Sequence, residues 1–255
     1  MAPRRLLIGT IGAAAIAAAF WLDRIPQDPA YHAFADHGML LGIPNFWNVA
    51  TNLPFLLVGL IGLAWRSRLR VQAPQTQYAV FCVGVMLVGL GSAYYHWAPS
   101  TPALVWDRLP MTVAFMALFS AVIQDRVSEH LGRVLLWPLV IAGIATIVWW
   151  YLSEQAGRGD LRSYAVVQFL PMLLIPLMLL LFNGRGLRDG WLWATLAAYV
   201  LAKVAEYFDA AIFSASGILS GHSLKHLLAA LAVWWAVRAF LEQETANLRS
   251  GTKRS

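Results

Sequence analysis

Apolar stretches long enough to cross a membrane recur along almost the whole chain. A helix needs about 20 predominantly apolar residues to span the hydrocarbon core of a bilayer. Only 13% of the 255 residues are charged, whereas soluble domains carry roughly 25%. The sequence therefore predicts an all-α, polytopic membrane helical bundle, with a seven-helix core and one extra N-terminal helix. The eight predicted spans are 5–22, 46–65, 78–97, 109–124, 134–152, 163–182, 191–213 and 217–240.

Two of these spans have unusual features. The stretch 109–124 is short, and we expect Pro110 to lie in the first turn of its helix, where proline is tolerated. The first stretch follows two arginines and is rich in alanine, as a signal peptide is. However, Phe20-Trp21-Leu22-Asp23 lacks the small-residue cleavage site of such peptides. We therefore expect residues 1–22 to be retained as a transmembrane helix.

The basic residues indicate how the helices are oriented. The net charge is +6, and cytoplasmic loops of membrane proteins carry an excess of lysine and arginine. The excess positive charge is explained by the orientation of the helices in the membrane, so no nucleic-acid partner is expected. The pattern predicts a multi-pass protein of the cell membrane with both termini in the cytoplasm. The predicted cytoplasmic set is Arg4, Arg5, Arg66, Arg68, Arg70, Arg126, Arg133, Arg185, Arg188, Arg238, Arg249, Lys253 and Arg254, against Arg24, Arg108, Arg158 and Arg162 outside.

The chain divides into four segments at the ends of these spans. The predicted segments are an N-terminal helix at 1–22, an extracytoplasmic segment at 23–45, a seven-helix core at 46–240 and a cytoplasmic tail at 241–255.

Cys82 is the only cysteine, so no intramolecular disulfide can form.

Histidines occur at two distant points that this topology brings to one depth. His96 ends the third span and Asp107 precedes the fourth, while His222 and His226 begin the last. All four are predicted to lie at the extracytoplasmic ends of their helices. Ionisable side chains within membrane spans are costly and usually functional. Histidines at i and i+4 share a helix face and can share a metal ion.

These residue types suit a catalytic zinc site near the extracytoplasmic leaflet. Three protein ligands and one open position are typical of such sites, and His96, His222 and His226 supply three imidazoles. Imidazole also suits iron, nickel and copper. Asp107 is the candidate general base. Ser92 shares a face with His96 and either stabilises an oxyanion or orients the neighbouring groups.

Several blocks of residues together resemble the alkaline ceramidase family, which belongs to the CREST superfamily of seven-helix membrane hydrolases. The resemblance covers most of residues 30–240. The matching blocks are Phe46-Trp47-Asn48-Val49-Ala50-Thr51-Asn52-Leu53, Gly91-Ser92-x-x-x-His96, Asp107-Arg108-Leu109-Pro110-Met111 and His222-x-x-x-His226.

The resemblance implies zinc held by His96, His222 and His226, with Ser92 and Asp107 at the reaction centre. It implies hydrolysis of the amide bond of a ceramide-like lipid to a sphingoid base and a fatty acid. A non-hydrolytic lipid receptor and a lipid esterase of the same superfamily are the alternatives, and the sequence predicts no oligomeric state.

Two residues depart from the family pattern. Asn45 stands where a glutamate is expected, and the segment before the core has few carboxylates, so calcium is not an expected cofactor. Arg108 replaces an acidic residue in the run Asp-Glu-Leu-Pro-Met, which leaves the exact substrate open.

The seventh predicted span carries three charged residues in an otherwise apolar helix. Lys203 and Glu206 are three residues apart and can pair, which lowers the cost of inserting them into a membrane. The sequence leaves two alternatives open: a structural ion pair between helices, or a role for Asp209, nearer the outer end, in orienting a metal ligand or shaping a headgroup pocket.

Overall fold

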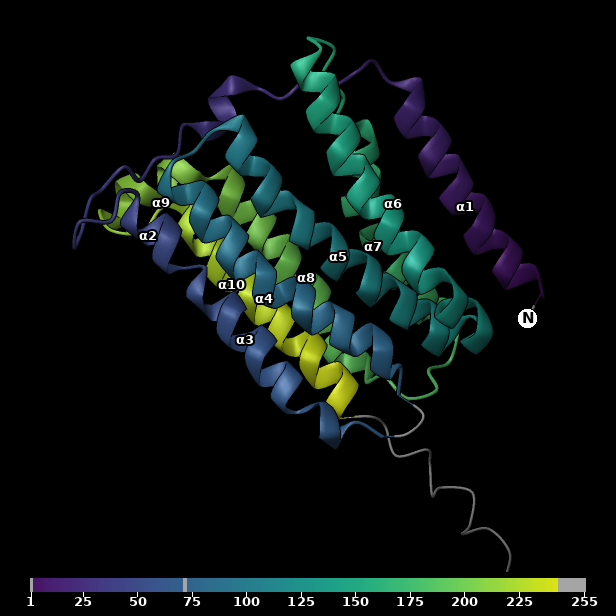
Figure 1. Cartoon of the computed structure of the whole chain (residues 1–255). Helices are drawn as coiled ribbons and strands as arrows, with labels where there is room; N and C mark the ends of the chain where they lie inside the picture. The colour runs from purple at the N-terminus through teal and green to yellow at the C-terminus, as the bar shows by residue number, and fades with distance from the viewer. Residues whose placement is uncertain (1, 71–72, 243–255) are drawn as a thin grey trace, which may run out of the picture.

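The computed structural model describes residues 2–70 and 73–242, and within them the chain forms helices and turns with no β-strand (Figure 1). The helices run in the order α1 (Ala2–Trp21), η1 (Pro29–His32), α2 (Phe46–Ala50), α3 (Leu53–Ala64), η2 (Arg66–Arg68), α4 (Gln75–Trp97), α5 (Thr101–Arg126), α6 (Glu129–Gln155), α7 (Arg162–Leu181), α8 (Asp189–Tyr207), α9 (Asp209–Ser216) and α10 (Gly221–Leu241).

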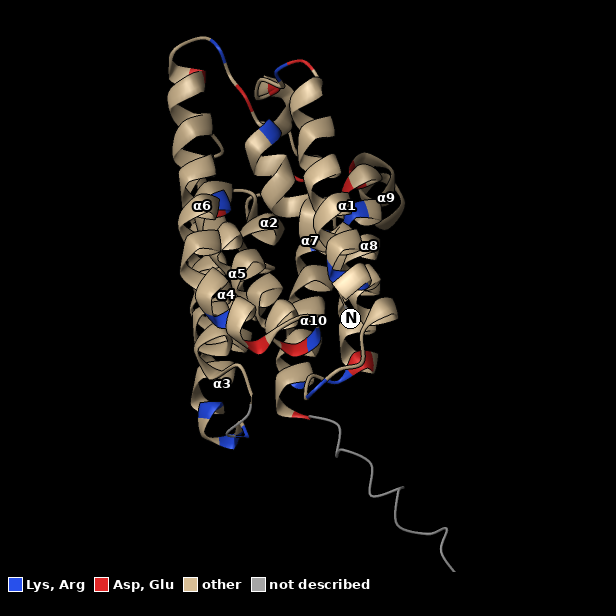
Figure 2. Ribbon diagram, turned by 90° about the vertical axis from the view of Figure 1, so that its right-hand side faces the viewer, with Lys and Arg blue, Asp and Glu red and all other residues tan. Residues whose placement is uncertain are grey.

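Seven helical segments of the described chain are long and apolar enough to cross a membrane, with α2 and α3 counted together as Phe46–Ala64. Most charged residues lie toward the ends of the helices in Figure 2. The predicted polytopic α-helical bundle is thereby confirmed. The remaining predicted span, 191–213, also forms helix, mostly as α8, but α8 does not reach the same apolarity because it carries Lys203 and Glu206.

The helices pack in neighbouring pairs, of which α4 with α5, α8 with α10, α5 with α6 and α3 with α4 share the most extensive contacts. Helix α1 lies at the edge of the bundle, against α7, and is mostly exposed to the surroundings (Figure 1). Its separate position agrees with the predicted extra N-terminal helix. The division at 22, 45 and 240 stays a prediction.

The helix predicted over 109–124 is longer than expected. Helix α5 begins at Thr101, where the Ser100 side chain accepts a hydrogen bond from the Ala103 backbone N–H. Pro102 therefore occupies the first turn, and Pro110 lies inside the helix. Placing Pro110 in the first turn was wrong because the polar capping residues lie before the apolar run that marked the span.

Pro110 coincides with the closest approach between α5 and α4. Proline has no N–H to offer the carbonyl four residues earlier, which is that of Trp106. The Trp106 carbonyl lies against Gly91 of α4, where a Cβ would stand 2.0 Å from its oxygen. Gly91 thus permits a helix contact that a larger residue would prevent, directly beside Ser92.

The predicted span 191–213 is divided in the structure. Helix α8 ends at Tyr207, and the short helix α9 starts at Asp209. The break follows from tertiary contacts, since the Asp209 carboxylate accepts hydrogen bonds from the backbone N–H groups of His222, at 2.7 Å, and Ala35, at 2.9 Å. Apolar composition alone does not reveal such a break.

Candidate metal centre

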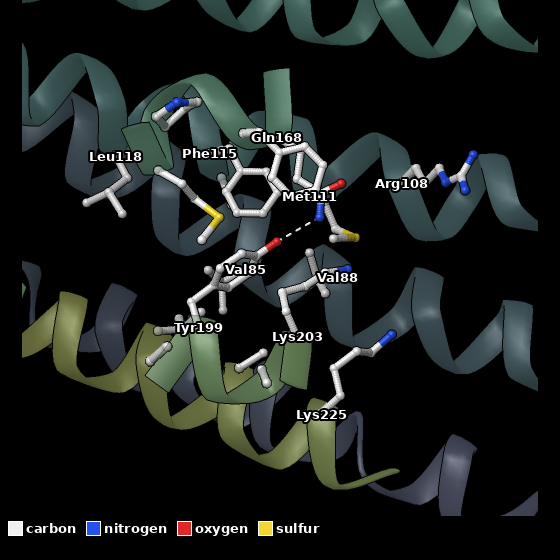
Figure 3. Close-up of a pocket in the computed structure, with 18 of the residues that line it drawn as sticks. Val85, Val88, Arg108, Met111, Phe115, Leu118, Gln168, Tyr199, Lys203 and Lys225 are labelled. Carbon is white, nitrogen blue, oxygen red and sulfur yellow. Dashed lines mark hydrogen bonds between the residues drawn. The ribbon is translucent and has the colours of Figure 1, made fainter. Parts of the chain in front are cut away.

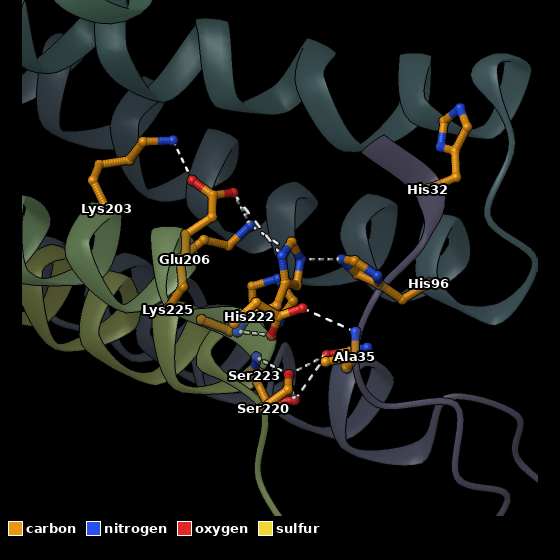
Figure 4. Close-up of polar contacts among 12 residues, drawn as sticks. His32, Ala35, His96, Lys203, Glu206, Ser220, His222, Ser223 and Lys225 are labelled. Carbon is orange, nitrogen blue, oxygen red and sulfur yellow. Dashed lines mark hydrogen bonds and ion pairs between the residues drawn. The ribbon is translucent and has the colours of Figure 1, made fainter. Parts of the chain in front are cut away.

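The three histidines predicted as metal ligands lie together at one end of the bundle. His96 comes from the last turn of α4, and His222 and His226 come from the first turns of α10. All three side chains are buried, and one nitrogen from each lies within 4.8 Å of the others. The Nε2 atoms of His96 and His222 are 3.2 Å apart (Figure 4). The group can hold a metal ion.

The start of α10 is fixed by polar contacts that set the position of its histidines. The Ser220 side chain caps the helix by accepting from the Ser223 N–H at 3.0 Å. The Asn48 Oδ1 of α2 accepts from the hydroxyls of Ser223, at 2.8 Å, and Ser220, at 3.4 Å. Asp209 holds the backbone N–H of His222, so it positions a candidate ligand through the main chain.

The hydrogen bonds of His226 determine which of its nitrogens is free. The Thr51 Oγ1 lies 2.6 Å from the Trp47 carbonyl oxygen and 3.0 Å from Nδ1 of His226. A hydroxyl has one proton, and a carbonyl can only accept, so Thr51 donates to Trp47. Nδ1 of His226 must then donate to Thr51, which leaves an unprotonated Nε2. This is the tautomer that binds a metal through Nε2.

The contacts of His222 likewise indicate that its Nε2 is unprotonated and carries a free lone pair. The Lys225 Nζ, which can only donate, lies 3.1 Å from His222 Nε2. The other ring nitrogen, Nδ1, lies 3.9 Å from the Glu206 Oε1 to which Lys225 is also bonded. A metal ion at Nε2 would replace the Lys225 contact and leave Lys225 with its other partner, Glu206, at 3.0 Å.

Zinc fits this donor set. Bonds of 2.0–2.1 Å in a tetrahedral site place two ligand nitrogens about 3.4 Å apart. The observed 3.2 Å between His96 and His222 is close to that separation. The Asn45 side chain also anchors the backbone carbonyl of His96 at 2.9 Å.

An aromatic residue that the motif analysis did not select covers the histidines. Phe34 is 5% exposed, and its ring centroid lies 4.7 Å from that of His96 and 4.3 Å from that of His222. It belongs to the segment before α2, where no periodic pattern marks it. Phe34 shields the cluster from the extracytoplasmic side of the predicted topology.

A cavity of about 350 Å³ adjoins the histidines between α4, α5, α7, α8 and α10 (Figure 3). Pockets for small molecules have volumes in this range. Ser92, Asp107 and His226 all line it. The structure therefore brings the predicted catalytic pair and one predicted ligand to the same space.

The cavity has a polar end and an apolar end. Asp107 and Leu118 line it about 16 Å apart along the axis of α5. Around Leu118 the lining is hydrocarbon and aromatic, with Phe115 and Val85 as neighbours (Figure 3). The charged side chains of Asp107, Arg108 and Lys225 line the end where α5 and α10 begin. Between the two ends, Gln168 donates a hydrogen bond to the Tyr199 hydroxyl at 2.8 Å (Figure 3). Such a shape suits a molecule with one polar group and a hydrocarbon chain.

Charged residues of α8 and α10 form a network beside the histidines. The predicted pairing of Lys203 with Glu206 is present. Lys225 of α10 joins it through Glu206 (Figure 4). Sequence reasoning did not assign Lys225 a role, although it lies within His222-Ser223-Leu224-Lys225-His226, because its partner is on another helix.

The comparisons with known proteins identify the family. A search of curated proteins finds no match for this chain. A family model described as Ceramidase matches residues 36–187, a range that includes Ser92, His96 and Asp107 and ends before His222. Because this match covers more than half of the 255 residues, the chain belongs to the ceramidase family.

Proposed function

We propose that this protein is a zinc-dependent intramembrane amidohydrolase that cleaves ceramide-like lipids to a sphingoid base and a fatty acid. The observation that carries the proposal is the convergence of three buried histidine nitrogens beside a cavity lined by Ser92 and Asp107. Family membership supports a ceramide-hydrolysing membrane enzyme, and the three histidines form a group that can hold the metal.

The metal would be held by His96, His222 and His226. When bound, zinc lowers the pKa of a water molecule and polarises a carbonyl group. The tautomers set by Thr51 and Lys225 leave Nε2 of His226 and His222 free to bind. Because three imidazole ligands are neutral, the zinc site would keep the net charge of +2, which suits the activation of water.

Asp107 would act as the general base. Its carboxylate opens onto the cavity and makes no ion pair within the described residues. It takes the proton that the attacking water loses and delivers it to the nitrogen of the amide as the carbon–nitrogen bond breaks. The products are a carboxylic acid and an amine, so atoms and protons balance.

Ser92 would assist on the neighbouring face of the cavity. Its hydroxyl lies beside the Asp107 carboxylate, and both face the same space. The hydroxyl either donates to the oxygen that gains negative charge in the transition state or holds Asp107 in position. Gly91 makes this possible by letting α4 approach α5 at that level.

The site is proposed to face the extracytoplasmic leaflet. The arginine-rich residues 66–70 after α3 and 183–188 between α7 and α8 lie at the end of the bundle where α10 ends, whereas His222 and His226 lie where α10 begins (Figures 1 and 2). Both termini are then cytoplasmic. The predicted tail at 241–255 lies almost entirely outside the described residues.

Incubation of the purified protein with labelled ceramide tests the proposal. We expect release of fatty acid and sphingoid base, loss of turnover after chelation, and recovery with zinc. Full turnover in the metal-free protein would contradict the mechanism. Stable binding of ceramide without product would instead favour a receptor, and preferential cleavage of a matched ester would favour an esterase.

A further inference from the structure

Arg108 places a positive charge at the polar end of the cavity. It follows Asp107 in α5, is 5% exposed and lies at the opposite end of the cavity from Leu118 (Figure 3). Its Cζ lies over three aromatic rings, at 4.5 Å from the ring centroid of Trp150, 4.9 Å from Tyr164 and 5.2 Å from Tyr31.

No ion pair within the described residues neutralises this charge. Within 2–70 and 73–242, no carboxylate forms an ion pair with Arg108, and its buried Nη1 has no hydrogen-bond partner. Arginine stays protonated in proteins, so the charge is permanent. Aromatic rings compensate only part of the cost of burying it. The missing acceptor is therefore expected to arrive with a ligand.

The cavity indicates which part of a ligand would bring that acceptor. A guanidinium matches carboxylate and phosphate groups through paired hydrogen bonds. The hydrocarbon chain of a lipid fits the end near Leu118, and the proposed function places the amide beside Asp107. Arg108 then faces the portion that continues beyond the amide nitrogen.

We propose that Arg108 binds an anionic group, a phosphate or a carboxylate, carried by the amine half of the lipid amide. The inference rests on the proposed function and makes it more specific, because the enzyme would prefer anionic lipid amides to neutral ones. Arg108 is then a specificity-determining residue, while Asp107 and the histidines carry out the hydrolysis.

Matched substrates test this preference in detergent micelles. Ceramide and ceramide 1-phosphate with the same acyl chain form the phosphate pair, and N-dodecanoylethanolamine and N-dodecanoylglycine form the carboxylate pair. We expect wild type to show the higher kcat/KM for the anionic member of at least one pair, and the pair that responds identifies the anion.

Two variants of Arg108 and one control complete the test. Arg108→Met should lower the anionic-to-neutral ratio of kcat/KM about 10- to 100-fold, as expected for a lost hydrogen bond to a charged group. Arg108→Lys keeps the charge without the paired geometry and should give an intermediate ratio. Arg158→Met removes an exposed arginine of the α6–α7 loop and should leave the ratio unchanged.

Calorimetric binding to the metal-free protein separates this proposal from the proposed function. Tighter, Arg108-dependent binding of N-dodecanoylglycine than of N-dodecanoylethanolamine supports the anion site even if no amide is cleaved. Cleavage with equal ratios in wild type and Arg108→Met would overturn the anion site and leave the hydrolase intact. Equally tight, Arg108-dependent binding of dodecanoate would also overturn it, because the anion would then belong to the acyl half.

Discussion

Two buried polar clusters at opposite ends of the bundle differ in whether their charges are paired. At the end that the predicted topology places toward the cytoplasm, called the inner end, Asp125 Oδ1 accepts backbone N–H bonds from Arg185, Gly186 and Leu187 at 2.7–3.2 Å. Its other oxygen lies 2.8 Å from Arg126 Nε. Arg126 also binds the carbonyls of the loop after α7 and the Asp189 carboxylate.

The outer cluster is left open. His96 Nδ1 and Arg108 Nη1 are buried without partners in the described chain, and Asp107 faces a cavity. A cluster whose charges pair with one another joins helices, whereas one whose charged groups make no ion pair and face a cavity retains capacity to bind something else. The comparison supports the proposal that the inner cluster serves stability and the outer cluster serves chemistry.

Asp107→Asn should produce the largest effect, and on rate alone. The amide keeps the size of the side chain but cannot act as a base, so we expect kcat to fall about 10²- to 10⁴-fold while bound zinc and thermal stability persist. Steady-state kinetics with metal analysis measures both. An unchanged pH–rate profile would argue against this role for Asp107.

Arg126→Met, at the inner end, should lower thermal stability and leave the rate unchanged. Removing one partner of a buried ion pair leaves Asp125 uncompensated, at a cost of about 3–5 kcal/mol. The Tm in detergent should fall by about 6–20 °C, with kcat per folded molecule retained. Arg133→Met, at an exposed pair with Glu129, is the matched control and should change Tm little. Equal Tm values for the two variants would remove the distinction between the clusters.

Thr51→Val tests the hydrogen bond that sets the tautomer of His226. Valine has a similar shape but no hydroxyl, so zinc affinity should fall about 10- to 100-fold. Competition with a chelator measures the affinity. Thr146→Val, whose hydroxyl only bonds the Gly143 carbonyl within α6, is the control. The same affinity in both variants would show that Thr51 does not orient the ligand.

His32 should contribute the smallest effect, through pH. Burial and then the positive charge of Arg108 hold the pKa of His32 below its usual 6.5. The neutral form is thus favoured in the folded state, and stability should decline as pH falls below about 6.5. His32→Gln should reduce the drop in Tm between pH 7.5 and 5.5 by at most about 2 °C, whereas His37→Gln, at an exposed position, should not. An identical drop in wild type and His32→Gln would contradict this.

The sequence predicted the fold well because spanning helices are marked by composition. It also pointed to His96, His222 and His226 as neighbours, since helix spacing and arginine distribution place them at one depth. The structure brings these three together, while their roles and those of Ser92 and Asp107 stay proposals.

Features that depend on long-range contacts escaped prediction. The end of α8 is set by Asp209 binding the N–H groups of Ala35 and His222. Phe34 meets the histidines only after an irregular segment folds back over them. Local sequence patterns do not identify such distant partners. For the same reason, the position of Pro110 within α5 and the contacts of Thr51 and Lys225 were not predicted.

Metal content tests the central claim most directly. Purified wild-type protein should contain about one zinc per chain by elemental analysis. His226→Ala should contain almost none while remaining folded, and the exposed-site control His130→Ala should match wild type. A wild-type protein that takes up no zinc, or a His226→Ala variant that retains it fully, would contradict the account.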